Sequence, residues 1–252
     1  MIKPFSNALR SEQQLNGLLI TMPSPELVEI VSAAGFDWLF FDLEHSAMGF
    51  ETLQNLLRCV KDPCFAAVRV PEAANAYVAK ALDAGAEAVI FPRISTVEQA
   101  RNAVLMCKYP PVGKRGVGLS RAQGYGNTFT EYLQAANERV ACILQIEDEQ
   151  GAKNAHQISE VEGVDALFVG PYDLSMSMGI PGEVTHERIN KIIRDLAEIK
   201  SRELGLGIFT TDLSSLREYS NLGYNLIACG IDVQLLNSGA RQLVRAVKNS
   251  LN

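Results

Sequence analysis

VACILQIE (residues 140–147) is an apolar run with the length of a strand, and it ends in an acid. A second run, ALFVGPYD (residues 166–173), also passes from apolar residues to an acid. Continuous apolar runs of this length are typical of strands buried in a parallel sheet. Acids at the carboxyl ends of adjacent parallel strands face the same mouth of a barrel. We therefore expect Glu147 and Asp173 to lie close together.

Outward from these two runs, short apolar segments alternate with longer segments of helical period. We expect strands at residues 18–22, 38–42, 65–70, 88–91, 140–146, 166–169, 205–209 and 226–229. We expect helices at residues 25–34, 50–60, 73–84, 96–108, 186–203, 212–222 and 233–249. Such alternation favours a parallel sheet with helical crossovers, and eight units in roughly 250 residues are typical of a (β/α)₈ TIM barrel. The sequence predicts one barrel domain over residues 1–252.

Polar side chains gather at one kind of junction in this pattern. Glycines at residues 35, 85, 163 and 223 stand between a helix and the next strand, where a left-handed residue often ends a helix. The opposite junctions, from strand to helix, carry His45, Arg69, Glu147 and Asp173. In a barrel these junctions form the rim that holds the active site.

Residues 109–137 interrupt the alternation between the fourth and fifth expected strands. The segment is too long for an ordinary loop. We expect it to form part of the pocket wall, an interface or a lid.

Composition bears on partners and location. The net charge is −6, the pI is about 5.2 and no basic block is present, so we expect no nucleic-acid partner. Residues 1–14 lack the apolar segment of a signal peptide, and no apolar run approaches the roughly 20 residues of a membrane helix. The five cysteines show no CxxC spacing, which suits a reducing compartment. We expect a cytoplasmic protein with no membrane partner.

Glu147 and Asp173 are the candidate metal ligands. Each has another interpretation, because an acid in the first turn of a helix is stabilised by the helix dipole. Two acids at consecutive strand ends favour metal ligation instead. Hard oxygen ligands with no thiolate or imidazole pair beside them suit Mg²⁺ or Mn²⁺ better than Zn²⁺, and Co²⁺ is a further candidate.

His45 and Arg69 are the candidate catalytic groups. The polar segment DLEH (residues 42–45) follows an almost fully apolar strand, and histidine has the pKa range of a base near neutral pH. A surface or capping histidine is the alternative. Arg69 ends the next apolar run, and its planar guanidinium suits a carboxylate or enolate oxygen. The alternative is a salt bridge to Asp42 or Glu44.

Other chemistries lack their residues. A Schiff-base aldolase needs a lysine pointing inward from a barrel strand. The lysines all fall in the termini, expected helices or loops: Lys3, Lys61, Lys80, Lys108, Lys114, Lys153, Lys191, Lys200 and Lys248. The chain also lacks a Gly-x-Ser-x-Gly elbow, a Walker loop and a Rossmann fingerprint, so we expect no nucleotide cofactor. A metal, a base and an arginine remain, which suits proton abstraction beside a carbonyl with the enolate held by the metal.

Short motifs along almost the whole chain resemble the HpcH/HpaI family of metal-dependent (class II) pyruvate aldolases, within the phosphoenolpyruvate/pyruvate barrel superfamily. The motifs are FDW (36–38) leading to DLEH (42–45), VRVP (68–71), LDAGA (82–86), KRG (114–116), QIE (145–147) and GPYDLS (170–175). Any one alone is weak, but their combination is specific.

The resemblance implies a role for each catalytic group. His45 would be the proton acceptor and donor, and Arg69 would stabilise the developing enolate. Asp83 would raise the basicity of His45. On its own position near the end of an expected helix, Asp83 is interpreted as a solvent-facing acid, and the resemblance overrides that interpretation.

The resemblance also implies the ligand contacts and the assembly. Glu147 and Asp173 would bind the divalent metal, while Gln145 and the backbone at Tyr172 and Asp173 would contact the pyruvate portion. The family is typically a homohexamer, a dimer of trimers, with exchanged C-terminal helices. In this chain the segment 233–249 carries an apolar stripe that could equally well cover its own barrel, so only the resemblance favours exchange.

This chain departs from the family pattern at three positions. Asp148 follows the first metal ligand where many relatives have threonine, and Leu43 replaces a residue that is frequently small. Tyr172 stands where many have a small residue, so its ring could narrow the aldehyde side of the pocket. These departures concern the identity of the substrate more than the type of reaction.

The resulting hypothesis is an aldolase that reversibly splits a 4-hydroxy-2-oxo acid into pyruvate and a small aldehyde. The substrate would be a 2-keto-3-deoxy sugar acid or a 4-hydroxy-2-oxo-dicarboxylate. The enzymatic alternative is a malyl- or citramalyl-CoA-type lyase, which the absence of a basic strip for the CoA phosphates disfavours. The non-enzymatic alternative is a metal-binding barrel that senses 2-oxo acids.

Overall fold

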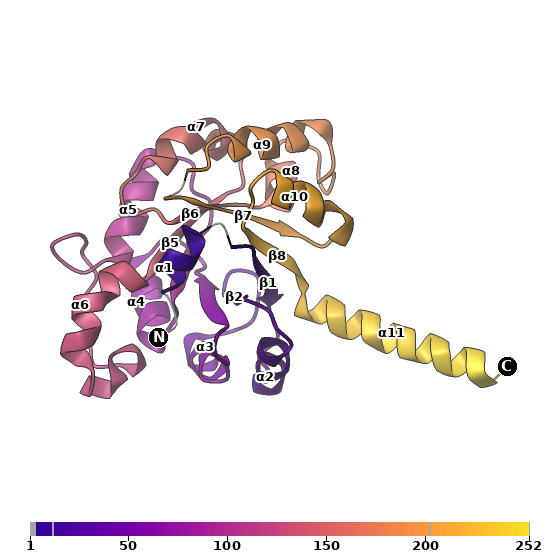
Figure 1. Ribbon diagram of the computed structural model, residues 1–252, viewed down its shortest axis with the longest axis horizontal. Coiled ribbons are helices and arrows are strands. Elements are labelled where there is room, and N and C mark those ends of the chain that lie inside the picture. Colours follow the sequence, from indigo (N-terminus) through magenta and orange to yellow (C-terminus); the bar gives the residue numbers. More distant parts are fainter. Residues whose placement is uncertain (1–3, 12, 202, 252) are drawn as a thin grey trace.

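Eight parallel strands form a closed barrel in the computed structural model, which describes residues 4–11, 13–201 and 203–251 (Figure 1). The strands are β1 (Leu15–Ile20), β2 (Trp38–Asp42), β3 (Phe65–Arg69), β4 (Ala88–Phe91), β5 (Ala141–Ile146), β6 (Ala166–Val169), β7 (Gly205–Thr210) and β8 (Leu226–Ile231). The TIM barrel predicted from the sequence is therefore confirmed. β1 begins at Leu15 rather than at residue 18, because Asn16 and Gly17 pair with β8 although they interrupt the apolar pattern.

Helices connect the strands and surround the barrel (Figure 1). They are α2 (Pro25–Ala33), α3 (Phe50–Leu57), α4 (Asn75–Ala84), α5 (Val97–Cys107), α6 (Phe129–Arg139), α7 (Glu149–Ser159), α8 (Pro171–Ser177), α9 (Glu187–Ala197) and α10 (Leu216–Asn221). Local sequence sets their starts, as at α5, where the Thr96 side chain accepts from the Gln99 backbone in a capping box. The interrupting segment 109–137 contains a short 3-10 helix, η1 (Arg121–Gly126), and most of α6.

Inward side chains of the strands fill the barrel interior. Trp38 and Phe40 of β2 pack edge-on against Phe168 of β6. The helix α1 (Phe5–Leu9), which lies outside the expected elements, adds Phe5 to the same cluster and stacks it on Phe65 with ring centroids 4.7 Å apart. The amino-terminal end of the barrel is therefore closed by an apolar plug.

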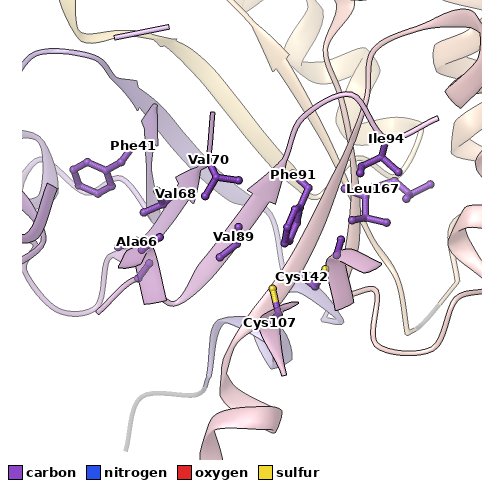
Figure 2. Close-up of a cluster of buried hydrophobic side chains, with 14 of the residues drawn as sticks. Phe41, Ala66, Val68, Val70, Val89, Phe91, Ile94, Cys107, Cys142 and Leu167 are labelled. Carbon is purple, nitrogen blue, oxygen red and sulfur yellow. The ribbon is translucent and has the colours of Figure 1, made fainter. Parts of the chain in front are cut away.

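Outward side chains of the same strands form a second core under the helices. Phe41, Val68 and Val89 lie on neighbouring strands in this layer (Figure 2). Because side chains alternate along a strand, the residues between them point into the barrel. This alternation continues to the strand ends, where Asp42 of β2 and Arg69 of β3 are paired in register on the inward side.

The C-terminal helix, α11 (Asp232–Leu251), projects away from the barrel (Figure 1). Its start is anchored by the buried Asp232, which accepts hydrogen bonds from the backbone of Thr21 and Met22 at 2.8 and 2.7 Å. The apolar stripe beyond it is exposed, at 46% for Val233 and 66% for Leu243. The interpretation in which this stripe covers its own barrel is therefore wrong, whereas exchange with another copy stays a prediction. None of the described helices has the length and apolar character needed to cross a bilayer.

Candidate active site

The mouth of the barrel holds a cavity of about 630 Å³ at the carboxyl ends of the strands. Among its lining residues are candidates identified from the sequence: His45, Arg69, Gln145, Tyr172 and Asp173. The other walls are mainly apolar and come from the strands and the start of α11: Leu19, Phe40, Phe168, Phe209, Ile231 and Val233. The cavity therefore combines a charged side with an apolar side.

Arg69 is held by a buried fork. Its Nε and Nη2 atoms donate to the two carboxylate oxygens of Asp42 at 2.9 and 2.7 Å, and the guanidinium carbon lies 5.3 Å from the centre of the Phe40 ring. Burial by itself would raise the pKa of Asp42, but the hydrogen bonds and charge of Arg69 outweigh burial and leave that pKa lowered. Arg69 thus forms the salt bridge that was the alternative interpretation, and its role toward an enolate oxygen stays a prediction. The hydrogen bond from Nη1 to Gln145 Oε1 is long, at 3.5 Å. This edge of the guanidinium is therefore weakly bound, and it faces the cavity wall.

Glu147 lies directly beside the cavity and is 5% exposed. The backbone N–H of Arg93 donates to its Oε1 at 2.6 Å, and the Gln145 amide donates to its Oε2. Burial raises the pKa of Glu147 to about 7, and the neighbouring charge of Asp173 acts in the same direction. Within residues 4–11, 13–201 and 203–251, neither Glu147 nor Asp173 forms an ion pair.

These two carboxylates fit a hard divalent cation. A Cβ at Gly170 would lie 3.1 Å from Glu147 Oε2, so the glycine keeps the space beside that oxygen open. In the part of the chain that the structure describes, no group of three or more His, Cys, Asp or Glu could hold a metal. Water and substrate oxygens would therefore have to complete the coordination, as is usual for Mg²⁺ held by one or two carboxylates.

His45 lies at the open side of the mouth, with 61% of its side chain exposed. The acid beside it is Glu44, whose Oε2 is 3.9 Å from His45 Nε2. Glu44 is itself almost buried and pairs with Arg93 at 2.7 Å. Burial raises the pKa of Glu44 despite the two nearby arginines, Arg69 and Arg93.

Asp83 is not brought to His45 within one chain. It lies in the last turn of α4, which runs antiparallel to the strands, so this turn lies at the amino-terminal end of the barrel. There its carboxylate accepts from Arg115 at 2.8 Å and from Gln123 at 3.4 Å. An intrachain effect of Asp83 on His45 is therefore wrong, because the two side chains belong to opposite ends of the molecule.

Arg93 was not predicted from the sequence. For the segment 109–137, a pocket wall, an interface and a lid remained as alternatives. Arg93 follows the apolar run of β4 just as the other site residues follow theirs, so the same strand-end rule would have found it. No described residue of 109–137 lines the cavity at the mouth, and the pocket-wall interpretation is wrong for the chain's own pocket. The segment instead lies against α4 through η1.

Tyr172 lies over one side of the cavity. Its hydroxyl is 3.3 Å from Thr211 Oγ1, and its ring centroid is 6.1 Å from that of Phe209. The side chain thus connects the start of α8 with the end of β7, across the apolar part of the mouth.

Comparison with known proteins places this architecture in context. The family model described as HpcH/HpaI aldolase/citrate lyase matches residues 16–238. The hydroxypyruvate/pyruvate aldolase of Paraburkholderia phytofirmans is 33% identical over 98% of this chain and 98% of its own length. The 4-hydroxy-2-oxo-heptane-1,7-dioate aldolase of Salmonella typhimurium is 33% identical over 96% of this chain and 94% of its own.

Solved structures agree with these relatives. The crystal structure of a HpcH/HpaI aldolase/citrate lyase family protein from Burkholderia cenocepacia J2315 superimposes with a TM-score of 0.92 at 35% identity, covering 97% of this chain and 98% of the other. The citrate lyase beta subunit from M. tuberculosis, complexed with oxaloacetate and magnesium, has a TM-score of 0.60 at 17% identity, over 90% of this chain and 95% of its own. The second likeness concerns the fold alone.

Proposed function

Because this chain belongs to the HpcH/HpaI aldolase/citrate lyase family and is a carbon–carbon lyase, we propose that it reversibly cleaves a 4-hydroxy-2-oxo acid to pyruvate and an aldehyde. The observation that carries the proposal is the convergence of His45, Arg69, Gln145 and Asp173 on one cavity, with Glu147 beside it. The relatives are named for hydroxypyruvate, pyruvate and a 4-hydroxy-2-oxo-dicarboxylate, which supports a short 2-oxo acid as the shared part of the substrate.

A divalent metal, Mg²⁺ or Mn²⁺, is part of the proposal, with Glu147 and Asp173 as its ligands. When bound, it would balance the negative charge that develops on the 2-oxo acid. Among the residues that the structure describes, neither carboxylate forms an ion pair, and this and the open space at Gly170 support the assignment.

His45 and Arg69 perform the proton transfer and the charge stabilisation. His45 takes the proton of the 4-hydroxyl group as the bond between carbons 3 and 4 breaks and the aldehyde leaves. The electron pair of that bond moves into the enolate, whose oxygen faces the weakly engaged Nη1 edge of Arg69. His45 then returns the proton to carbon 3, which becomes the methyl group of pyruvate.

The direct test is exchange of the pyruvate methyl protons in D₂O, followed by NMR with Mg²⁺ or Mn²⁺ and again with EDTA. Enolate formation requires no knowledge of the aldehyde, so metal-dependent exchange that is lost in His45→Ala and Arg69→Ala would support the mechanism. Absence of exchange in a protein that binds the metal would contradict it and favour a thioester lyase or a 2-oxo-acid sensor.

Assembly is the second part of the proposal, with a homohexamer as the expected state. Since Asp83 and His45 lie at opposite ends of one chain, Asp83 reaches a histidine only from another copy. The exposed stripe of α11 and the exposed apolar side chains of Val117 and Leu119 near Asp83 supply surfaces for such copies.

Mixing two inactive variants tests whether one site contains His45 of one copy and Asp83 of another. His45→Ala and Asp83→Asn should each be nearly inactive, and a mixture that is allowed to exchange subunits should recover activity, because some sites then receive both intact residues. A monomeric mass in solution, or no recovery in mixtures shown to contain both chains, would contradict a shared site.

A further inference from the structure

Arg93 has an unusual backbone for its residue type. It follows β4, and its φ of +55° makes it one of two non-glycine residues with positive φ in the described chain. A side chain with a Cβ disfavours this left-handed region, so the conformation persists only where surrounding contacts hold it. At Arg93 these contacts all involve the mouth of the barrel.

Three hydrogen bonds hold Arg93. Its backbone N–H donates to Glu147 Oε1 at 2.6 Å. Its Nη1 donates to Glu44 Oε1 at 2.7 Å, and its Nη2 donates to the carbonyl of Pro71 at 3.0 Å. One residue thus links the end of β5 with the loops that follow β2 and β3.

Glu44 is the group that this arrangement controls. Its Oε2 is 3.4 Å from Arg69 Nε and 3.9 Å from His45 Nε2, and its charge also acts on Glu147. Glu44 already pairs with Arg69 at Nε, so a Glu44 released from Arg93 would rotate further across that guanidinium, toward the Nη1 edge that faces the enolate in the proposed mechanism. The guanidinium of Arg93 prevents this by fixing Glu44 to the β3 loop.

We propose that Arg93 is a positioning residue with two actions, one of its backbone on Glu147 and one of its guanidinium on Glu44. These are the backbone half and the guanidinium half of the proposal. Its left-handed backbone aims an N–H at the candidate metal ligand Glu147, and its guanidinium keeps Glu44 at the Nε side of Arg69, away from the Nη1 edge that faces the enolate. This inference rests on the proposed metal site and mechanism, so its test includes a direct measurement of metal binding.

The backbone half is tested with Arg93→Gly and Arg93→Val. Both variants lose the guanidinium and keep the N–H, but glycine adopts positive φ freely, whereas a β-branched residue does not. We expect Mn²⁺, measured by EPR titration, to bind Arg93→Val about tenfold more weakly than Arg93→Gly, the factor that matches the usual cost of a left-handed residue. Equal affinities in two variants with matching circular dichroism would overturn this half.

The guanidinium half is tested with Arg93→Gly alone and combined with Glu44→Gln. Releasing Glu44 should raise the KM for pyruvate in the exchange assay about two- to fivefold, the effect of one partly exposed charge pair, with a smaller change in kcat. Adding Glu44→Gln should restore KM, and Arg93→Lys should restore it in part because one charged donor remains. A raised KM that Glu44→Gln leaves unchanged would overturn this half.

The outcomes also separate this inference from the proposed function. Weaker Mn²⁺ binding by Arg93→Val in a protein that exchanges no pyruvate protons would support positioning and contradict the aldolase mechanism. A wild-type protein that binds no Mn²⁺ would overturn the metal site and the backbone half together.

Discussion

The two ends of the barrel each hold a cavity and a shielded acid, yet they differ in what surrounds that acid. The cavity at the mouth has a volume of about 630 Å³, and the one at the amino-terminal end has about 620 Å³. Burial raises the pKa of Glu147 at the mouth to about 7, and burial likewise raises that of Glu87 at the other end to about 7. Volume and pKa alone do not distinguish the two ends.

The partners of each acid do distinguish them. Glu87 accepts from the backbone N–H of Ala66, and the nearby Arg121 donates to the carbonyls of Ala84 and Leu57 at 2.9 and 3.3 Å. These polar groups tie turns together. At the mouth, side chains from several strands converge instead, because inward rows continue past the strand ends into the loops that precede the helices. Convergence of side chains therefore identifies the site better than a cavity or a raised pKa does.

The largest expected difference between the ends is in activity. Glu147→Gln should lower metal-dependent pyruvate exchange on the order of 10³-fold. It removes one of the two negative charges proposed to bind the metal, and that metal balances the charge that develops on the enolate. Glu87→Gln, the matched change at the other end, should change the exchange rate less than about twofold, as befits a substitution away from the site. NMR exchange rates at one Mg²⁺ concentration, the same for wild type and both variants, measure both. Comparable losses in the two variants would contradict the assignment of the mouth as the site.

A smaller loss is expected when the charge at the mouth is kept and only its geometry changes. Arg69→Lys should reduce exchange about 10²-fold, since an ammonium group cannot donate two parallel hydrogen bonds to Asp42 and still face the enolate oxygen. Arg10→Lys is the control at the opposite end, where Arg10 pairs with Asp165 at 2.8 Å. It should leave exchange unchanged; full activity of Arg69→Lys would show that the fork is not needed.

At the amino-terminal end, Glu87 should affect the free energy of unfolding rather than the activity. Because the folded pKa of Glu87 is about 7, above its ordinary 4.5, the folded protein binds more protons, and the free energy of unfolding should fall as pH rises between these values. Glu87→Gln removes this loss, so it should be more stable than wild type at pH 8 by about 1–3 kcal/mol and by less at pH 5.

Urea unfolding at the two pH values measures this difference. The substitution Glu162→Gln, at an exposed position, is the control for the loss of one carboxylate. A constant difference between Glu87→Gln and wild type at both pH values would show that the raised pKa is not present in solution.

The smallest expected effect concerns the choice of aldehyde. Tyr172→Ala removes a ring from the apolar side of the mouth and should raise kcat/KM for a bulky aldehyde about tenfold relative to a small one, a factor typical of one apolar contact in a pocket. Pyruvate exchange, which involves no aldehyde, should change less. A parallel change in kcat/KM for both aldehydes would indicate that Tyr172 acts on the pyruvate half.

Much of the mouth could be predicted from local sequence. Apolar runs of strand length located all the strands to within a few residues, and the residues at their carboxyl ends predicted His45, Arg69, Glu147 and Asp173 as one group, whereas Gln145 was implied only by the family resemblance. This works because the strand period and the closure of the barrel bring every strand end to the same rim. Arg93 was accessible to the same rule at β4.

Other features required the folded chain. Asp83 belongs to the same motif set as His45 but lies at the opposite end, because a helix returns the chain antiparallel to the strand before it. The short plug α1 has too few residues for a periodic signal, and contacts with distant residues, among them those of Phe5 with Trp38 and Phe65, stabilise it.

Local periodicity and short motifs were enough to predict the barrel, the family and the rim that holds the candidate residues. The folded structure was needed to establish which acids form ion pairs, as Asp42 does with Arg69, and which form none among the described residues, as Glu147. It also decided that the stripe on α11 finds no cover within the described chain. The physical reason is that pairing and burial depend on contacts between residues far apart in sequence, which local patterns do not encode.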